Sequence, residues 1–307
     1  MRKIKRCRKQ SLVLFMALGM ALYLTAPVLA ATAGTTSEDP LPIIGAQIRE
    51  VIENIDLKCY RIQDRPLDRN LLLQHLNPVL IDRGWPEEPV VLFEAQQLCV
   101  PVAKDGRIPP ERVLALIQWL DLKCYRIQGQ PINESIFLSH LNPVLIERGW
   151  PDEEVIVTEP QQLCVPVAKD GQIPPPAALN LVQWIDLKAY GIIGPPPSPD
   201  EIISLKHLNP VLQRRQWPDE RVVVGEATQL MVPVAKNGRM PTDDVLLLAS
   251  FIDLKCHRII DRPINQPLRL THLNPVLREM QAPDETVMVM EPVQLCVPVV
   301  KDGVFPE

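Results

Sequence analysis

The chain has 307 residues, with 32 basic and 37 acidic side chains and a formal net charge of −5. Six of the basic residues lie within the first ten positions, so the rest of the chain holds 26 basic against 37 acidic residues. This acidic balance excludes nucleic acid and anionic membranes as expected partners, because neutralising phosphates requires clustered Lys and Arg.

The N-terminal segment has the three-part layout of a secretory signal peptide. Its basic stretch precedes an apolar run over 12–24, which is followed by Pro27 and small residues over 28–33. Cleavage after Ala30 and cleavage after Ala33 fit equally well, and an uncleaved anchor helix is the alternative. The apolar run is short for the ~30 Å hydrocarbon core of a bilayer. We therefore expect a signal peptide over 1–30, a linker over 31–40, and a secreted or otherwise extracytoplasmic mature protein with no membrane span.

Four copies of one unit follow the linker. Asp-Leu-Lys-Cys-Tyr at 56–60, His-Leu-Asn-Pro-Val-Leu at 75–80 and Lys-Asp-Gly at 104–106 each return three times, with small changes. The boundaries fall near 41–106, 107–171, 172–238 and 239–307, which we call repeats 1 to 4. A unit of this length is long enough for a core of its own. We therefore expect four small tandem domains.

Two cysteines recur in repeats 1, 2 and 4, whereas repeat 3 has Ala189 and Met231 at these positions. Pairing within each repeat uses all six cysteines, while pairing between neighbouring repeats leaves several thiols unpaired. The pattern therefore predicts the disulfides Cys59–Cys99, Cys124–Cys164 and Cys256–Cys296. Metal binding is the alternative, but no Cys-x-x-Cys pair supports it. We expect no metal and no cofactor, and disulfides suit an exported protein.

Local patterns indicate a β-rich fold, all-β or α+β, with one or two short helices per repeat. In repeat 1 the alternation over 57–62 and the segments 90–94 and 97–103 predict strands, with Pro101 at a sheet edge or a bulge. Asn77-Pro78 predicts the start of a short helix that closes near Gly84. Asp105-Gly106 predicts a tight turn. The apolar segment before Asp56 suits either a helix or a strand.

Several polar residues recur and need an interpretation. The histidines of the His-x-Asn-Pro blocks lack a consistent nucleophile or orienting acid, so we expect them to support the fold by bonding backbone. Recurring carboxylates form no cluster that would bind Ca²⁺, and we expect turn caps and solvated ion pairs. The Lys before each Asp-Gly is interpreted as an edge-strand charge. These sets are His75, His140, His207 and His272; Asp56, Asp121, Asp186 and Asp253; Glu94, Glu159, Glu226 and Glu291; and Lys104, Lys169, Lys236 and Lys301.

Tryptophans follow the short helix in three repeats, as Trp85, Trp150 and Trp217, with Ala282 in repeat 4. They are candidates for stacking on a glycan or a peptide, and core packing is the alternative. The sequence has no Gly-x-Ser-x-Gly, His-Glu-x-x-His, P-loop or dinucleotide-binding motif. We expect a non-enzymatic exported protein with a structural or interaction role at the cell surface or outside the cell. A glycan- or peptide-binding module is the alternative, and no catalytic residue is assigned.

The blocks Leu-Lys-Cys-Tyr-Arg-Ile (57–62), His-Leu-Asn-Pro-Val-Leu (75–80) and Gln-Leu-Cys-Val-Pro-Val-Ala-Lys-Asp-Gly (97–106) resemble an uncharacterised domain family of exported prokaryotic proteins. The resemblance covers essentially the chain after the leader. It implies an extracytoplasmic module, often in tandem, and brings no activity, substrate or catalytic residue. Repeat 3 departs from the pattern because it lacks both cysteines.

Overall fold

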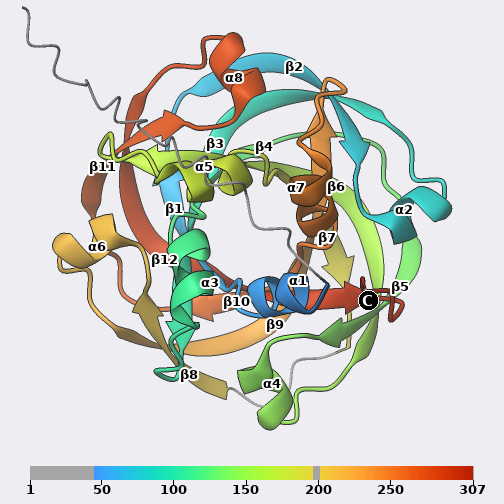
Figure 1. The fold of residues 1–307 in the computed structure, drawn as a ribbon, viewed down its shortest axis with the longest axis horizontal. Coiled ribbons are helices and arrows are strands. Elements are labelled where there is room, and N and C mark those ends of the chain that lie inside the picture. The colour runs from blue at the N-terminus through green and yellow to red at the C-terminus, as the bar shows by residue number, and fades with distance from the viewer. Residues whose placement is uncertain (1–44, 196–200, 307) are drawn as a thin grey trace, which may run out of the picture. The chain divides into compact units, whose positions relative to one another are not determined.

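The computed structural model describes residues 45–195 and 201–306, and Pro40–Glu307 form one compact unit. The predicted signal peptide and linker lie outside the described residues. No helix in the described ranges is both long and apolar enough to cross a bilayer. The succession helix, strand, strand, helix, long strand occurs four times along the unit (Figure 1).

Each repeat supplies five of these elements. Repeat 1 holds α1 (Gly45–Ile52), β1 (Leu57–Gln63), β2 (Pro66–His75), α2 (Pro78–Asp82) and β3 (Glu88–Lys104). Repeat 2 holds α3 (Glu111–Ile117), β4 (Leu122–Arg126), β5 (Glu134–His140), α4 (Pro143–Glu147) and β6 (Glu153–Lys169). Repeat 3 holds α5 (Pro176–Val182), β7 (Leu187–Ile193), β8 (Glu201–His207), α6 (Pro210–Arg214) and β9 (Glu220–Lys236). Repeat 4 holds α7 (Asp243–Ala249), β10 (Asp253–Ile260), β11 (Gln266–His272), α8 (Pro275–Glu279) and β12 (Glu285–Lys301).

Eight strands, two from each repeat, close into a barrel. They pair antiparallel in the cycle β1, β3, β4, β6, β7, β9, β10, β12 and back to β1. The last pairing joins repeat 4 to repeat 1, with Leu57 opposite Cys296. Closure leaves none of these eight strands with a free edge, which is how barrels avoid edge-to-edge aggregation.

The remaining strands tie together repeats that are two apart along the chain. The hairpin strand β2 pairs with β3 of its own repeat and with the end of β9 in repeat 3, and β8 pairs with β9 and the end of β3. In the same way β5 pairs with β6 and β12, and β11 pairs with β12 and β6. Instead of the four expected domains, the structure has one barrel. The physical reason is that each repeat contributes only two barrel strands and completes its hydrogen bonding on other repeats.

The predicted local elements of repeat 1 are largely present. The strand at 57–62 is β1, and the segments 90–94 and 97–103 join into the single strand β3. Asn77 caps α2, since its side chain accepts a hydrogen bond from Val79 N at 3.0 Å. Gly84 has the positive φ (+72°) that a helix-terminating glycine adopts. The ambiguous segment before Asp56 contains a helix, α1.

One expectation about the strands needs correction, and one strand was missed. Pro101 lies inside β3 rather than at a sheet edge, at the point where β3 exchanges its neighbour β4 for β8. Pro101 has no backbone N–H to donate. It is tolerated there because the hydrogen-bond ladder of β3 is interrupted between the last pair with β4 and the first pair with β8. The strand β2 was not predicted. Its residues 68–70 are all exposed, and the alternation of buried and less buried side chains begins only at Leu71.

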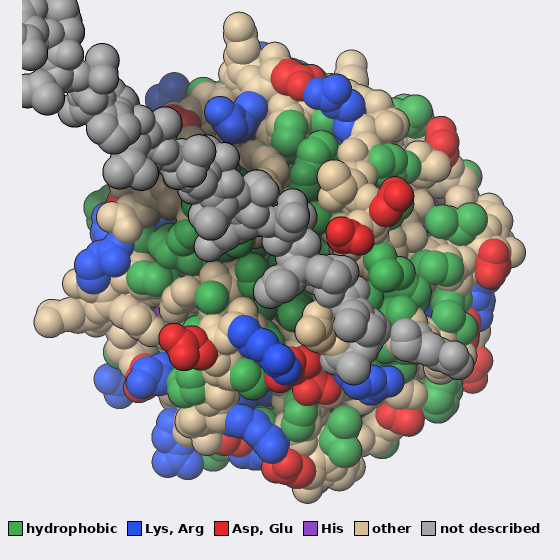
Figure 2. All heavy atoms as spheres, in the orientation of Figure 1, with side chains coloured by type: hydrophobic (Ala, Val, Ile, Leu, Met, Phe, Trp, Pro, Cys, Tyr) green, Lys and Arg blue, Asp and Glu red, His purple; other side chains and the backbone are tan. Residues whose placement is uncertain are grey.

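The main core lies inside the barrel and under the four longer helices. Buried side chains of α1, α3, α5 and α7 pack with the six cysteines, Ala189 and Met231 in one apolar cluster. In Figure 1 these helices lie within the ring of strands. They therefore close one mouth of the barrel with apolar side chains. On the face shown in Figure 2, acidic and basic side chains are interspersed and neither sign dominates.

Candidate functional site

The three predicted disulfides are present, and each links two neighbouring strands of the barrel wall. Cys59–Cys99, Cys124–Cys164 and Cys256–Cys296 are bonded, and within each pair the two residues stand directly opposite each other on neighbouring strands. Ala189 and Met231 occupy the equivalent opposed positions in repeat 3. All eight side chains are fully buried. Together they form one layer of the barrel interior.

A layer of glutamines lies next to this sulfur layer. The long strands carry the pairs Gln96-Gln97, Gln161-Gln162, Thr228-Gln229 and Val293-Gln294, two residues before the cysteine or methionine. Side chains two residues apart on a strand share a face, so the second member of each pair points inward beside the sulfur layer. The register agrees, since each of these glutamines stands opposite the first cysteine, or Ala189, of the following repeat.

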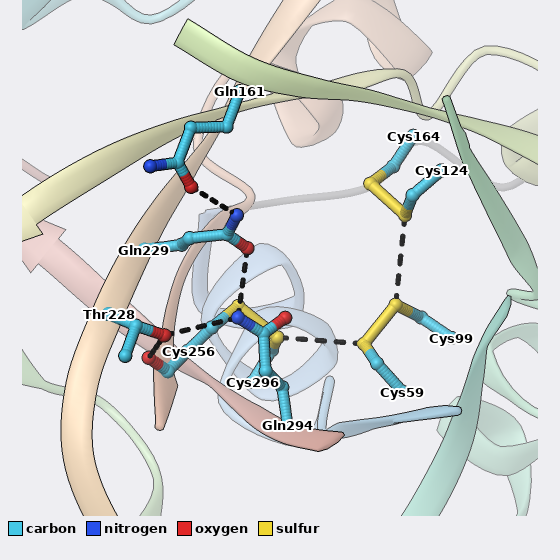
Figure 3. Close-up of a disulfide and its surroundings, with 10 residues drawn as sticks. All are labelled: Cys59, Cys99, Cys124, Gln161, Cys164, Thr228, Gln229, Cys256, Gln294 and Cys296. Atoms are coloured by element: carbon cyan, nitrogen blue, oxygen red, sulfur yellow. Dashed lines mark hydrogen bonds between the residues drawn. A yellow bond between two sulfur atoms is a disulfide. The ribbon is translucent and has the colours of Figure 1, made fainter. Parts of the chain in front are cut away.

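Hydrogen bonds link this glutamine layer across three of the four junctions between repeats. Gln162 Nε2 donates to Gln96 Oε1 at 3.2 Å, and Gln229 Nε2 donates to Gln161 Oε1 at 2.6 Å. Gln294 Nε2 reaches Thr228 Oγ1 at 3.1 Å and Gln229 Oε1 at 3.0 Å. Figure 3 shows part of this ladder beside the disulfides. At each linked junction the inward glutamine donates to the first residue of the preceding pair.

The fourth junction, between repeats 4 and 1, is open. The residue that would accept from Gln97 is Val293, which has no polar side-chain atom. Gln97 Oε1 is buried and has no partner in the described part of the chain. Gln294 Oε1 is also unpartnered, on a side chain that is only 7% exposed. Gln162 Oε1, in a repeat whose two junctions are both bridged, is unpartnered as well. What sets the fourth junction apart is that Val293 leaves the Gln97 N–H groups without the acceptor that the other three junctions supply. We call this junction the seam.

Two adjoining cavities lie at the seam, and both are lined by Gln97 and Val293. The first has a volume of about 300 Å³ and is completed by Gln161, Thr228, Gln229, Arg258 and Gln294. The second has a volume of about 420 Å³ and is completed by Arg61, Ile62, Gln63, Asp64, Glu94, Ala95 and Gln96. These volumes fall within the range of small-molecule sites, and the mouth of a barrel is a common place for one.

The charged side chains around the seam are paired with opposite charges. Arg61 lies 2.9 Å from Glu291, and Arg258 lies 3.4 Å from Glu226. Arg126 donates two hydrogen bonds to Glu94 at 2.7 and 3.1 Å, which lowers the pKa of that carboxyl. These three recurring glutamates are partly exposed and form ion pairs, which agrees with the expectation of solvated ion pairs. Arg258, Arg61, Glu94 and Asp64 line the cavities, and Asp64 is paired with the buried Lys123. The seam therefore presents amide groups without a net excess of charge.

The recurring histidines are buried and bond side chains rather than the backbone that we expected. His75 Nε2 lies 3.1 Å from the hydroxyl of Tyr190, and His207 and His272 bond Tyr60 and Tyr125 in the same way at 3.0 Å. His140 instead lies 3.4 Å from Lys255 Nζ and faces His257. Burial lowers the pKa of His75 to about 3. These neutral, enclosed imidazoles support the fold, joining repeats that are two apart.

The tryptophans sit in the same clusters. Trp85 packs edge-on against His75 and Tyr190, and Trp217 packs in the same way against His207 and Tyr60. Both are buried, with 7% and 5% of their surface exposed, while Trp150 is partly buried. The indole N–H groups of Trp85 and Trp217 donate to Glu134 and Gln266 at 2.9 Å. Their placement matches the alternative of core packing.

The Lys before each Asp-Gly is not an edge-strand charge, and the recurring aspartates are not solvated. Lys104 is 1% exposed and forms an ion pair with Asp56, which also accepts a hydrogen bond from Asn142 of the next repeat at 2.8 Å. The same triad occurs at every junction, as Asp121–Lys169–Asn209, Asp186–Lys236–Asn274 and Asp253–Lys301–Asn77. The correction follows from barrel closure, because these positions face the interior.

Within the described ranges, no group of His, Cys, Asp and Glu side chains is arranged to hold a metal ion. Comparison of the chain with family models, with curated proteins and with solved structures finds no match. The candidate functional site therefore rests on geometry alone, and it is the seam. Sequence analysis did not identify it, although the repeated glutamines and the exceptional Val293 were visible in the aligned repeats.

Proposed function

We propose that this protein is an exported, non-enzymatic protein that serves an interaction role at the cell surface or outside the cell. Support for export comes from the three disulfides, all of which are fully buried. Disulfides persist in oxidising compartments and are rare where thiols are kept reduced. The basic and apolar N-terminal segment of the sequence points the same way.

The observation that carries the interaction role is the contrast between the buried ionisable groups and the accessible seam. The imidazoles of His75, His207 and His272 are enclosed, and burial lowers the pKa of each to about 3, far from the range useful for proton transfer near neutral pH. The groups with free hydrogen-bonding capacity at the seam are amides, which recognise ligands but do not transfer protons. A binding role is therefore favoured over catalysis.

The glycan- or peptide-binding role of Trp85, Trp150 and Trp217 receives no support from their positions. Trp85 and Trp217 are almost fully buried and already use their indole N–H groups. A stacking platform needs an exposed ring face. Membership of the uncharacterised family of exported proteins stays a prediction from the repeated cysteine blocks.

Two measurements test the proposal. The full chain is expressed in a bacterial host with a periplasm, and the mature N-terminus and thiol content are determined by mass spectrometry. We expect cleavage after Ala30 or Ala33 and no free thiol in the exported product. The oxidised protein is then used as bait against envelope and secreted fractions of its source. A cytoplasmic, uncleaved and reduced product would overturn export, and the lack of any saturable partner in those fractions would overturn the interaction role.

A further inference from the structure

We propose that the seam between repeats 4 and 1 binds an uncharged saccharide through the free carboxamide of Gln97. The inference rests on the proposed interaction role and adds to it the site and the class of ligand. It starts from the one break in the glutamine layer. Three junctions are bridged by side-chain hydrogen bonds, and the fourth carries Val293 where the others carry a glutamine or a threonine.

The break leaves hydrogen-bonding capacity that faces the cavities. The carboxamide of Gln97, which lines both cavities, makes no hydrogen bond with another described residue, so its N–H groups lack an acceptor and its buried oxygen lacks a donor. Gln294 Oε1 adds a second acceptor on a side chain that lines the first cavity and is 93% buried. Leaving such a buried group unsatisfied is unfavourable. A ligand that donates to these oxygens and accepts from the Gln97 N–H relieves that cost.

The arrangement favours hydroxyl groups. A carboxamide presents a donor and an acceptor side by side, and two neighbouring sugar hydroxyls offer the complementary acceptor and donor. The two cavities share Gln97 and Val293, so they form one elongated site that suits more than one sugar unit. The partly buried Val293, which lines both cavities, supplies an apolar contact for the C–H face of a ring.

Charge argues for a neutral ligand. Arg61 and Arg258, the two basic residues of the lining, are paired with Glu291 and Glu226. A charged sugar would have to break one of these pairs or be held without a counter-charge. An uncharged saccharide can bind while both pairs remain in place.

Barrel closure argues against a peptide. Extended peptides commonly bind by adding a strand to a free sheet edge. Gln97 on β3 is paired on both sides, with Arg61 of β1 and Cys124 of β4. The strand β12 lies between β1 and β10, and Val293 falls at a register shift in its pairing with β1. The seam therefore has no continuous free strand edge to which a peptide could add, which leaves recognition to the side-chain amides.

The test uses the oxidised protein without its leader and a panel of neutral probes: glucose, galactose, mannose, N-acetylglucosamine, maltose, cellobiose and chitobiose. Binding is measured by calorimetry, and the Gln side-chain amide resonances are followed by NMR in ¹⁵N-labelled protein. We expect at least one probe to bind saturably and to shift the Gln97 amide resonance. An N-acetylated triglycine amide tests for peptide binding, and galacturonate tests for binding of a charged sugar. We expect neither compound to compete with the neutral sugar that binds.

Two variants locate the contact. Val293→Gln supplies the missing acceptor and closes the glutamine layer, so we expect the binding to be lost. Gln97→Leu removes the free carboxamide, and we expect affinity to fall about tenfold, the loss of one good hydrogen bond. Val223→Gln is the matched control, since it makes the same change at an exposed position of β9 that lines neither cavity.

The inference is overturned if no neutral sugar shifts the Gln97 resonance, if the peptide arm binds instead, or if Val293→Gln binds as the unchanged protein does. Because the NMR titration is made on the unchanged protein, the result does not depend on the folding of a variant. A negative titration together with a saturable partner in the envelope fraction would reject the saccharide and leave the interaction role standing.

Discussion

The sulfur of Cys59 lies 3.8 Å from the sulfur of Cys296, although 237 residues separate them. The contact joins the disulfide of repeat 1 to that of repeat 4, at the place where the barrel closes. On the other side, Cys99 Sγ lies 3.7 Å from Cys124 Sγ of repeat 2 (Figure 3). The disulfide of repeat 1 therefore touches the disulfides of repeats 2 and 4, and the cores of the repeats are continuous.

A continuous core predicts that the barrel unfolds in one step. If the repeats were separate domains, each would unfold at its own denaturant concentration. Here the strands of every repeat complete their pairing on other repeats, so no repeat can open without breaking the barrel. We expect tryptophan fluorescence and far-UV circular dichroism to give coincident urea transitions with disulfides intact. Separate transitions, or a transition assigned to repeat 3 alone, would contradict this.

Repeat 3 offers a site for a fourth disulfide. Ala189 and Met231 stand directly opposite each other and are fully buried, as are the three natural pairs. We expect Ala189→Cys with Met231→Cys to oxidise without rearranging the others. The loop that it closes is similar in length to the natural ones, so the chain-entropy model predicts a gain of about 4 kcal/mol.

Thiol counting and urea denaturation measure the outcome. Ala189→Cys alone is the matched control, since it adds a thiol without a partner and should retain one free thiol. A double variant that retains two free thiols after oxidation would show that the opposed register does not hold in solution.

The repeats determined the cysteine pairing in advance because the two positions are lost together in repeat 3. The helix cap and the turns could also be predicted from the sequence, since Asn77, Gly84 and Asp105-Gly106 act through local backbone geometry. The barrel could not be predicted from the sequence. Nothing within one repeat reveals that β2 continues its pairing on β9, and a pattern that suits a self-contained domain suits a shared barrel equally well.

The same limit explains the errors about Lys104 and Asp56. A charged residue before a tight turn is normally solvated, and only closure of the barrel buries it. The seam could not be predicted from the sequence for a related reason. Val293 differs from its counterparts in the sequence, but its significance depends on which repeat follows repeat 4 around the barrel, and that neighbour is repeat 1.

The buried triads predict a large effect of removing one charge. Lys104→Met leaves Asp56 buried without its counter-charge, and breaking a buried pair in this way costs about 3–5 kcal/mol. Adding Asp56→Asn removes the orphaned charge, so we expect the double variant to recover part of the loss. Urea denaturation provides both values. An effect below about 1 kcal/mol for Lys104→Met, as expected of an exposed charge, would show that the pair is solvated.

The tryptophan clusters predict a structural rather than a binding role for Trp85. Its ring packs against His75 and Tyr190 and is almost fully buried. We expect Trp85→Ala to lower the free energy of unfolding by about 3–5 kcal/mol. Trp85→Phe keeps most of the packing and should lose less. A variant that keeps full stability and loses a ligand would instead restore Trp85 as a binding residue.

Burial of all five histidines predicts acid sensitivity, which one substitution can isolate. Burial lowers the pKa of His257 to about 3, against about 6.5 in an unfolded chain. Between these values the unfolded chain binds a proton that the native protein does not, so this group makes stability fall as pH falls from 6.5 towards 3.

His257→Tyr removes that contribution and introduces the side chain that the other repeats have at this position. Relative to its value at pH 8, the stability of the variant should fall less on acidification, by about 2 kcal/mol at pH 5. Urea denaturation of both proteins from pH 8 to pH 4 measures the difference. The buried Asp121, whose pKa burial raises to about 6, acts in the opposite direction but equally in both proteins, so it cancels. Parallel stability curves would show that His257 titrates normally in the native barrel.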